Sequence, residues 1–241
     1  MPRIGTIATM PSRIETFAQV LPVIVSQVDQ VFVFLDGFET IPGFLQGLTK
    51  VTMVRSQDAG NYHAAGRFLC LQQLARPSVV LSFDDDIHYP SDYAAKLIQA
   101  LVRFDGKAVV GVHCQIFRPP FANYVRDRKV FHFADRLWRF KRCDELGAGT
   151  LAFCTDRFSF DVRPWTTFRS NDICVAIEAK KAGLPLWCIP RRNRWMQPFS
   201  QPQAFSIWAE TQRDPREKTT LMRQLLAEKV AAYELSKAAG V

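Results

Sequence analysis

Residues 79–90 read Val-Val-Leu-Ser-Phe-Asp-Asp-Asp-Ile-His-Tyr-Pro, so an apolar run passes directly into three consecutive aspartates. The run at 79–83 has the composition of a buried strand, and Pro90 is typical of a residue near the start of a helix. Side chains alternate along an extended chain, which predicts that Asp84 and Asp86 face the same ligand. Adjacent carboxylates repel each other, so the cluster indicates either an exposed loop in which one aspartate caps the next helix or a bound cation. Mg²⁺ and Mn²⁺ suit such oxygen ligands, because they take few protein carboxylates and complete their coordination with water and substrate phosphates.

Strand-like and helix-like segments alternate along the rest of the chain. Apolar runs rich in Val, Ile and Phe predict further strands at 4–9, 31–35, 51–54, 108–112 and 184–189. Helices are predicted at 62–74, 91–104 and 171–182, the last of them ending before Gly183. This alternation predicts an α/β fold with a mostly parallel sheet flanked by helices. Ligands of such sheets bind beyond the carboxyl ends of the strands, which is where the three aspartates lie.

The composition excludes several classes of protein. With 241 residues, 48% of them hydrophobic, the chain is a globular protein rather than a disordered, collagenous or coiled-coil one. Its formal net charge of +8 suits a protein that handles phosphates, nucleic acid or an anionic membrane. The six cysteines include no CxxC pair, which argues against a zinc knuckle. The first residues lack the apolar region of a secretory signal and no apolar run approaches the ~18 residues of a membrane-spanning helix, so a cytoplasmic location is expected.

Two segments depart from the alternation. Residues 118–142 carry eight lysines and arginines against two acids, interleaved with aromatic side chains. This segment could contact an anionic acceptor such as a lipid diphosphate, rest peripherally on the anionic inner face of a membrane, or form a solvated face over an aromatic core. We expect one domain at 1–195 and a C-terminal helical extension at 196–241 that packs on it. The extension is predicted to contain a helix with one apolar stripe, formed by Met222, Leu225, Leu226, Val230 and Tyr233.

Six loops carry motifs at the ends of the predicted strands. They are Ala8 to Arg13, Leu35 to Gly37, Asp58 to Asn61 with Arg67 further on, Asp84 to Asp86, Gly147 to Thr150, and Asn171 with Asp172 at a helix start. Their order resembles that of the GT-A nucleotide-sugar glycosyltransferases, close to the family-2 type found among bacterial surface-polysaccharide enzymes. The likeness extends over about residues 3–195. It implies a GT-A fold, a Mn²⁺ or Mg²⁺ cofactor, a nucleotide-sugar donor with UDP as the expected nucleotide, and a glycan or lipid-linked glycan acceptor.

The resemblance implies roles for four residues that would bind the donor nucleotide. Thr9 and Asp36 would frame the base, with the Asp36 carboxylate accepting a hydrogen bond from a uracil-like N–H. An aspartate in a turn is the alternative interpretation of Asp36. Asp58 and Arg67 would hold the base, the ribose or the diphosphate. For Arg67, a solvated helical arginine is the alternative.

The acidic cluster would complete the donor site. The resemblance implies that Asp84 and Asp85 contact the donor and that Asp84 and Asp86 bind the metal ion bridging the diphosphate. His113 follows the strand predicted at 108–112. Its position suggests either a third metal ligand or a histidine that lies beside the site without binding metal.

The last two motifs would form the acceptor side. Gly147, Gly149 and Thr150 would shape a turn near the acceptor, where glycine lets the backbone approach closely. Asp172 matches the catalytic base of the family. It would accept the proton of the acceptor hydroxyl, whose single displacement of the diphosphate would invert the anomeric carbon. Family-2 enzymes often carry Glu-Asp where this chain has Asn171 and Asp172, which leaves Asp172 as the carboxylate of the motif. The alternative is a helix-terminal aspartate stabilised by the helix dipole.

Two other functions fit parts of the sequence. A sugar-nucleotide nucleotidyltransferase should open with a loop like Gly-x-Gly-Thr-Arg, whereas residues 8–13 read Ala-Thr-Met-Pro-Ser-Arg. A nucleic-acid-binding protein is favoured only by the net charge and by the basic-aromatic segment 118–142. The acidic cluster at a strand end fits nucleic-acid binding poorly, so no nucleic-acid partner is expected.

Overall fold

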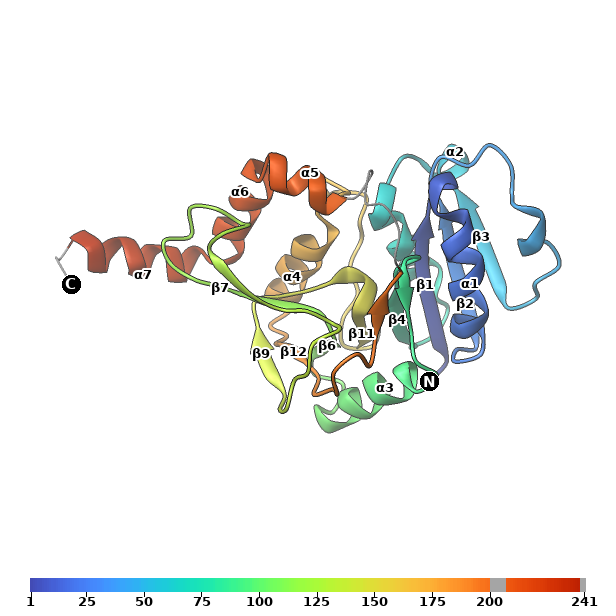
Figure 1. Ribbon diagram of the computed structural model, residues 1–241, viewed down its shortest axis with the longest axis horizontal. Helices are drawn as coiled ribbons and strands as arrows, with labels where there is room; N and C mark the ends of the chain where they lie inside the picture. The colour runs from blue at the N-terminus through green and yellow to red at the C-terminus, as the bar shows by residue number, and fades with distance from the viewer. Residues whose placement is uncertain (200–206, 239–241) are drawn as a thin grey trace.

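The computed structural model describes residues 1–199 and 207–238 (Figure 1). The strands of its main sheet are β1 (Arg3–Thr9), β2 (Gln30–Leu35), β3 (Val51–Arg55), β4 (Val79–Phe83), β6 (Val109–Gly111), β9 (Lys141–Cys143), β11 (Leu151–Cys154) and β12 (Leu186–Cys188). They lie in the order β3-β2-β1-β4-β11-β6-β12-β9. Strands β3, β2, β1 and β4 are parallel to one another, and β12 is parallel to β6. In contrast, β11 is antiparallel to both of its neighbours and β9 is antiparallel to β12.

The predicted α/β sheet is confirmed. Each of the six predicted strands begins and ends within two residues of the predicted bounds. Strand β11 is absent from those predictions, although it lies in the middle of the sheet. It contains only the apolar run Leu-Ala-Phe-Cys, which is too short to distinguish a buried strand from a helical turn. Its antiparallel direction also breaks the strand–helix alternation from which the other strands were inferred.

Helices cover both faces of the sheet. They are α1 (Ile14–Val25), the 3-10 helix η3 (His63–Gln73), α3 (Tyr93–Arg103) and α4 (Asn171–Lys181). Because strand side chains alternate, Leu81 and Phe83 of β4 pack with α1 and α3, whereas Val80 faces the apolar cluster formed with η3 and α4. The carboxyl end of β4 therefore lies between two packed layers, and the loop that leaves it is held from both sides.

Two of the three predicted helices are confirmed as α-helices, α3 and α4. The residues after α4 follow the expected ending, since Gly183 has a left-handed φ of 70°. The helix predicted at 62–74 is a 3-10 helix, η3, pressed against β2 at Gly66, where a Cβ atom would lie 2.3 Å from the Phe34 ring. Helix α1 was not predicted; it contains Pro22, and its buried stripe is formed by Phe17, Val20, Leu21 and Ile24.

Shorter elements connect the main ones. They are η1 (Pro11–Arg13), η2 (Gly43–Leu45), α2 (Ser56–Ala59), β5 (Ile87–His88), β7 (Cys114–Phe117), β8 (Arg128–Phe131), β10 (Glu145–Leu146), η4 (Ala148–Thr150) and β13 (Gln197–Pro198). Strand β7 pairs with β8 and β10 in a small antiparallel sheet. Strand β5 pairs with β13, so the segment after the three aspartates is tied to residues close to the end of the predicted domain.

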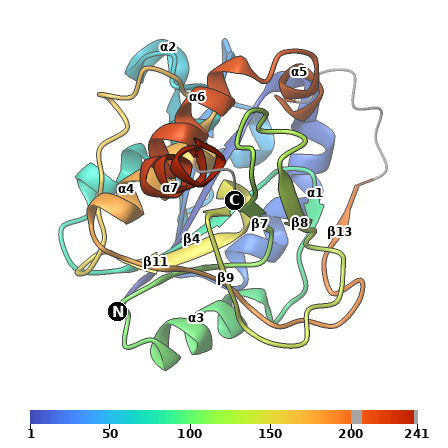
Figure 2. The same cartoon turned by 90° about the vertical axis from the view of Figure 1, so that its left-hand side faces the viewer.

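The C-terminal part consists of α5 (Ile207–Arg213), α6 (Arg216–Leu225) and α7 (Ala227–Ala238), and α7 reaches away from the sheet (Figures 1 and 2). The single helix expected here is therefore two helices. Met222 and Val230 are buried on either side of the break and Leu226 is buried at the break itself, whereas Tyr233 is only half-buried. The break lets both helices direct apolar side chains into the cluster shared with α4. None of the helices in 1–199 and 207–238 is long and apolar enough to cross a membrane.

Candidate active site

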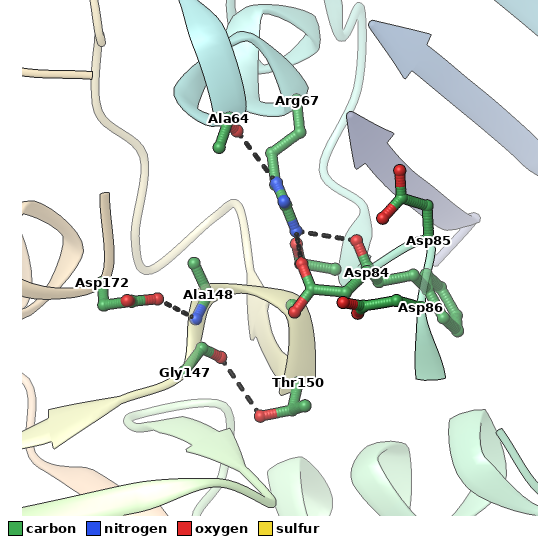
Figure 3. A network of polar contacts seen from close by, with 12 residues as sticks. Ala64, Arg67, Asp84, Asp85, Asp86, Gly147, Ala148, Thr150 and Asp172 are labelled. Atoms are coloured by element: carbon green, nitrogen blue, oxygen red, sulfur yellow. Dashed lines mark hydrogen bonds and ion pairs between the residues drawn. The ribbon is translucent and has the colours of Figure 1, made fainter. Parts of the chain in front are cut away.

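The three aspartates occupy the turn between β4 and β5. The carboxylates of Asp84 and Asp86 point to the same side, and that of Asp85 points away from them (Figure 3). The sequence predicted that Asp84 and Asp86 face the same side, and it did so by assuming an extended chain. In the structure Asp85 and Asp86 lie in a turn instead. The turn brings Asp84 and Asp86 close enough for their charges to interact, and Asp84 raises the pKa of Asp86 after the larger effect of burial.

Arg67 holds the first aspartate. Its side chain is buried, so the interpretation as a solvated helical arginine is wrong. The Nη1 atom donates to Asp84 Oδ1 and to the Phe83 carbonyl oxygen, both at 2.7 Å, and Nε donates to the Ala64 carbonyl oxygen at 2.9 Å (Figure 3). Burial disfavours the charged guanidinium, but Asp84 raises the pKa of Arg67 above its ordinary value. Arg67 therefore stays charged and fixes Asp84 at the end of β4.

Gly149 packs directly against Asp84. A Cβ atom on Gly149 would lie 1.9 Å from the carboxylate carbon of Asp84, so no other residue fits there without moving the aspartate. Tyr89 links the same two residues, since its hydroxyl accepts from the Asp84 N–H at 2.7 Å and donates to the Gly149 carbonyl oxygen at 2.6 Å. Sequence reasoning missed Tyr89, which reads as one more apolar residue at a helix start. The glycine turn predicted for the acceptor side thus adjoins the acidic cluster.

Arg13 is the second cation of the cluster. It forms an ion pair with Asp86 and lies 3.8 Å from Asp85. Burial raises the pKa of Asp85 to about 7, with a further contribution from Asp86, while Thr9 and Arg13 lower it. Burial also raises the pKa of Asp86, against the effect of Arg13. Two guanidinium groups therefore do not fully compensate three carboxylates, and the cluster favours an additional cation.

The residues predicted to frame the base lie at the ends of neighbouring strands. The Asp36 N–H, after β2, donates to the carbonyl oxygen of Thr9, the last residue of β1, at 2.9 Å. The Asp36 carboxylate is 3.1 Å from Nδ1 of His63 at the start of η3. Asp58 is separate from this pair, because both of its oxygens accept from Arg55 at 2.9 Å and its side chain is 55% exposed.

Asp172 lies at the start of α4, on the other side of η4 from the acids. Its Oδ1 atom accepts from the Ala148 N–H at 2.6 Å (Figure 3), and its side chain is 30% exposed. Thr150 closes the same turn, donating to the Gly147 carbonyl oxygen at 3.1 Å and accepting from the His113 N–H at 3.0 Å. One short 3-10 helix therefore contacts Asp84 through Gly149 and Asp172 through Ala148.

His113 is surrounded by other side chains rather than by the acids. Its ring packs against His132 and Phe133, and burial lowers the pKa of His113 to about 3, so the imidazole is neutral. Across residues 1–199 and 207–238, no three His, Cys, Asp or Glu side chains are placed to hold one metal ion together. A cation at Asp84 and Asp86 would take its remaining ligands from water and substrate, as Mg²⁺ commonly does.

The raised pKa of Asp85 predicts how stability depends on pH. Between about pH 4 and 7 the folded protein binds a proton that the unfolded chain has released, so wild type should lose stability relative to Asp85→Asn as the pH rises. The difference should reach up to about 4 kcal/mol above pH 7, at 1.36 kcal/mol for each pKa unit. Urea titrations of both proteins with a chelator present measure it. A difference that does not change between pH 4 and 8 would contradict this account.

Comparison with known proteins identifies the fold. No protein-family model and no curated protein matches the sequence. Glucosyl-3-phosphoglycerate synthase from Mycobacterium tuberculosis, solved with Mn²⁺, UDP and glucosyl-3-phosphoglycerate, matches with a TM-score of 0.51 and 14% identity, over 98% of this chain and 79% of that one. A mannosyltransferase from Pyrobaculum calidifontis, solved with GDP-mannose and Mn²⁺, matches with a TM-score of 0.51 and 15% identity, over 100% of this chain and 76% of that one. The chain therefore has the GT-A fold of these glycosyltransferases, as its motifs predicted.

Proposed function

We propose that the protein is a metal-dependent glycosyltransferase that moves a sugar from a UDP-sugar to a glycan or lipid-linked glycan, with inversion at the anomeric carbon. One observation carries the proposal. Asp84 and Asp86 face one side of η4 at the carboxyl end of β4, and Asp172 is held on the other side by the Ala148 N–H. This arrangement supports an acidic donor site and a separate carboxylate at the same end of a GT-A sheet.

Asp84 and Asp86 are the residues that would hold Mn²⁺ or Mg²⁺. Their oxygens are the ligands that these ions prefer, and the cluster keeps uncompensated negative charge beside Arg13 and Arg67. When bound, the ion would neutralise the negative charge that develops on the leaving diphosphate. Arg13 is half-buried at the rim of the cluster, so its charge adds to the attraction for a diphosphate.

The nucleotide would lie across the ends of β1 and β2. Asp36 would accept from the base, and its contact with His63 Nδ1 holds the carboxylate in one orientation. Thr9 supports the same position through its main chain. Asp58 would contact the ribose from the edge of the sheet, where its side chain is accessible.

Asp172 would accept the proton of the attacking hydroxyl. Its side chain is partly exposed. The Ala148 N–H fixes Oδ1, and Oδ2, which lies 3.9 Å from Lys218 Nζ, would face the acceptor. A carboxylate that removes this proton while the donor bond breaks typically contributes about 10²–10⁴-fold. Attack from the face opposite the diphosphate inverts the anomeric carbon.

Nucleotide binding should depend on a divalent ion and on the acidic cluster. With UDP at 100 times its dissociation constant and Mn²⁺ present, we expect the melting temperature to rise by about 5–11 °C, from about 2.7 kcal/mol of binding energy. Asp86→Asn should abolish the shift, because it removes a metal ligand. GDP, CDP and ADP measured in parallel identify the base.

The matched control is Asp105→Asn. Asp105 lies in the turn before β6, at the end of the sheet opposite to the acidic cluster, and its side chain is 80% exposed. This variant should keep the full shift. No metal-dependent shift with any of the four nucleotides would refute the donor site.

Turnover should depend on Asp172 without affecting donor binding. Asp172→Asn removes the base but keeps an oxygen that can accept from the Ala148 N–H, so it should lower kcat by about 10²–10⁴-fold and leave the thermal shift with UDP and Mn²⁺ intact. NMR of the linkage formed from an α-linked donor should show a β product. An α product would disprove inversion, and turnover of a sugar 1-phosphate with a nucleoside triphosphate would indicate a nucleotidyltransferase instead.

The basic-aromatic segment supports a peripheral contact with an anionic membrane. Trp138 is 78% exposed, and the Arg136 guanidinium lies over its ring. Further cations of the segment are exposed; they are Arg126, Lys129, Arg139, Lys141 and Arg142. Phosphatidylcholine vesicles that contain phosphatidylglycerol should sediment the protein, and added salt should weaken this binding. Trp138→Ala should reduce it, whereas Val102→Ala, at an equally exposed apolar residue of α3, should not. Equal binding to vesicles without phosphatidylglycerol would count against an anionic contact.

A further inference from the structure

Three consecutive residues of α6 contact the segments that present Asp172. Glu217 accepts two hydrogen bonds through Oε1, from the Ser170 hydroxyl at 2.6 Å and from the Thr167 hydroxyl at 2.7 Å. Thr219 accepts from the Tyr124 N–H at 3.0 Å through its hydroxyl oxygen. Lys218 lies between them. The first turn of α6 is therefore fixed to the chain before α4 and to the segment that carries Tyr124.

The Lys218 ammonium group lies beside Asp172. Its Nζ atom is 3.9 Å from Asp172 Oδ2 and 5.2 Å from the centre of the Tyr124 ring, and the residue is buried. A lysine in the first turn of a helix is unfavourable for the helix dipole, and a buried lysine loses its hydration. Glu217 offsets the first cost within the same turn, and the carboxylate that Lys218 faces accounts for its buried position.

The start of α4 also depends on α6. Ser170 occupies the N-cap position of α4, yet its side chain makes no capping hydrogen bond with the helix. Its hydroxyl donates to Glu217 instead. The direction in which α4 begins, and with it the position of Asp172, is thus set by a residue of the C-terminal helices rather than by a local cap.

Glu145 is a second carboxylate of this cluster. It is buried, its Oε1 atom accepts from the Tyr124 hydroxyl at 2.6 Å and from the Gln115 amide, and Oε2 has no hydrogen-bond partner in the described part of the chain. Burial raises the pKa of Glu145 to about 7, Asp172 raises it further, and Lys218 lowers it. Asp172, Glu145 and Lys218 therefore form one coupled group.

The other titratable and charged groups near this pair come from several elements. Burial raises the pKa of the Cys174 thiol of α4 to about 12, and the nearby charges of Asp172 and Glu217 raise it further. Arg128 of β8 lies over the Tyr124 ring and donates to Gln115. Burial also raises the pKa of the Tyr124 hydroxyl well above its ordinary value, so it remains a hydrogen-bond donor to Glu145.

We propose that the first turn of α6 belongs to the active site and that Lys218 is a positioning residue, which holds the Asp172 carboxylate in place beside the Ala148 N–H. The inference rests on the proposed function in so far as Asp172 is the base. It extends the site beyond the domain predicted at 1–195, because the C-terminal helices then complete the acceptor side.

The test compares three variants by steady-state kinetics across pH. Removing a cation next to a carboxylate favours its protonated form, so Lys218→Met should move the acid limb of the kcat profile up by about one pH unit and leave the donor KM within about twofold. Lys218→Arg should keep the limb in place. In the double variant Lys218→Met/Glu145→Gln, the acid limb should return toward its wild-type position, because the neighbouring carboxylate that repels Asp172 is gone.

Lys180→Met is the matched control. Lys180 of α4 donates to the Leu225 carbonyl oxygen at 2.8 Å, so it links the same two helices without contacting Asp172. It should lower stability without moving the acid limb. If Lys218→Met moves the limb no more than Lys180→Met does, Lys218 is only structural and the inference is overturned.

A readout without turnover separates this inference from the proposed function. In protein labelled with ¹³C-glutamate, the Glu145 carboxyl, assigned with Glu145→Gln, should titrate near pH 7. Its midpoint should rise in Lys218→Met and fall in Asp172→Asn. If no nucleotide sugar is turned over but both shifts occur, the proposed function fails and the coupled group stands. A wild-type Glu145 that titrates like an exposed glutamate overturns the inference, whether or not the variants fold.

Discussion

The buried ion pair between Arg67 and Asp84 is the contact on which the candidate site depends. A guanidinium group removed from water loses several kcal/mol of hydration unless its N–H groups find acceptors. Arg67 finds them at Ala64, at Phe83, which ends β4, and at Asp84, which follows it. The position of η3 against the sheet and the orientation of the first aspartate are therefore set by the same hydrogen bonds. Asp84 is oriented by core packing rather than by the loop in which it lies.

The 3-10 helix η4 carries this constraint to the other half of the site. The Cα of Gly149 packs on the Asp84 carboxylate, and the Ala148 N–H binds Asp172. Both contacts use main-chain atoms, whose positions follow from the pairing of β11 with β4 and β6 immediately after η4. Strand β11, which was not predicted, thus helps to position Asp84 and Asp172, which were predicted as site residues. The separation of Asp84 and Asp172 is therefore fixed by backbone geometry, which varies less than side-chain rotamers do.

The sequence was sufficient to predict what is local. The apolar run at 79–83 ends in its aspartates, and strand β4 and the acidic turn lie where that pattern placed them. Tyr89 and Gly149 show the limit, because each reads as an ordinary residue until the fold brings it onto Asp84. The C-terminal stripe shows another limit. Four of its five residues are buried as the spacing indicated, and Tyr233 is half-buried. The spacing of one helix and that of two short helices joined at Leu226 are too similar to separate without the surface on which they pack.

The counter-ions of the site explain why its second half was harder to infer. Asp84, Asp86 and Asp172 each lie beside a cation from another element, namely Arg67 of η3, Arg13 of η1 and Lys218 of α6. The acids stand at strand or helix ends, where sequence patterns place them, whereas these cations resemble the many surface lysines and arginines of a chain with a net charge of +8. The positive net charge of the chain reflects its many surface lysines and arginines, and it does not indicate that the candidate site is acidic. Because burial makes each such pair costly unless both members are present, the cations are as much a part of the site as the acids, and only the fold identifies them.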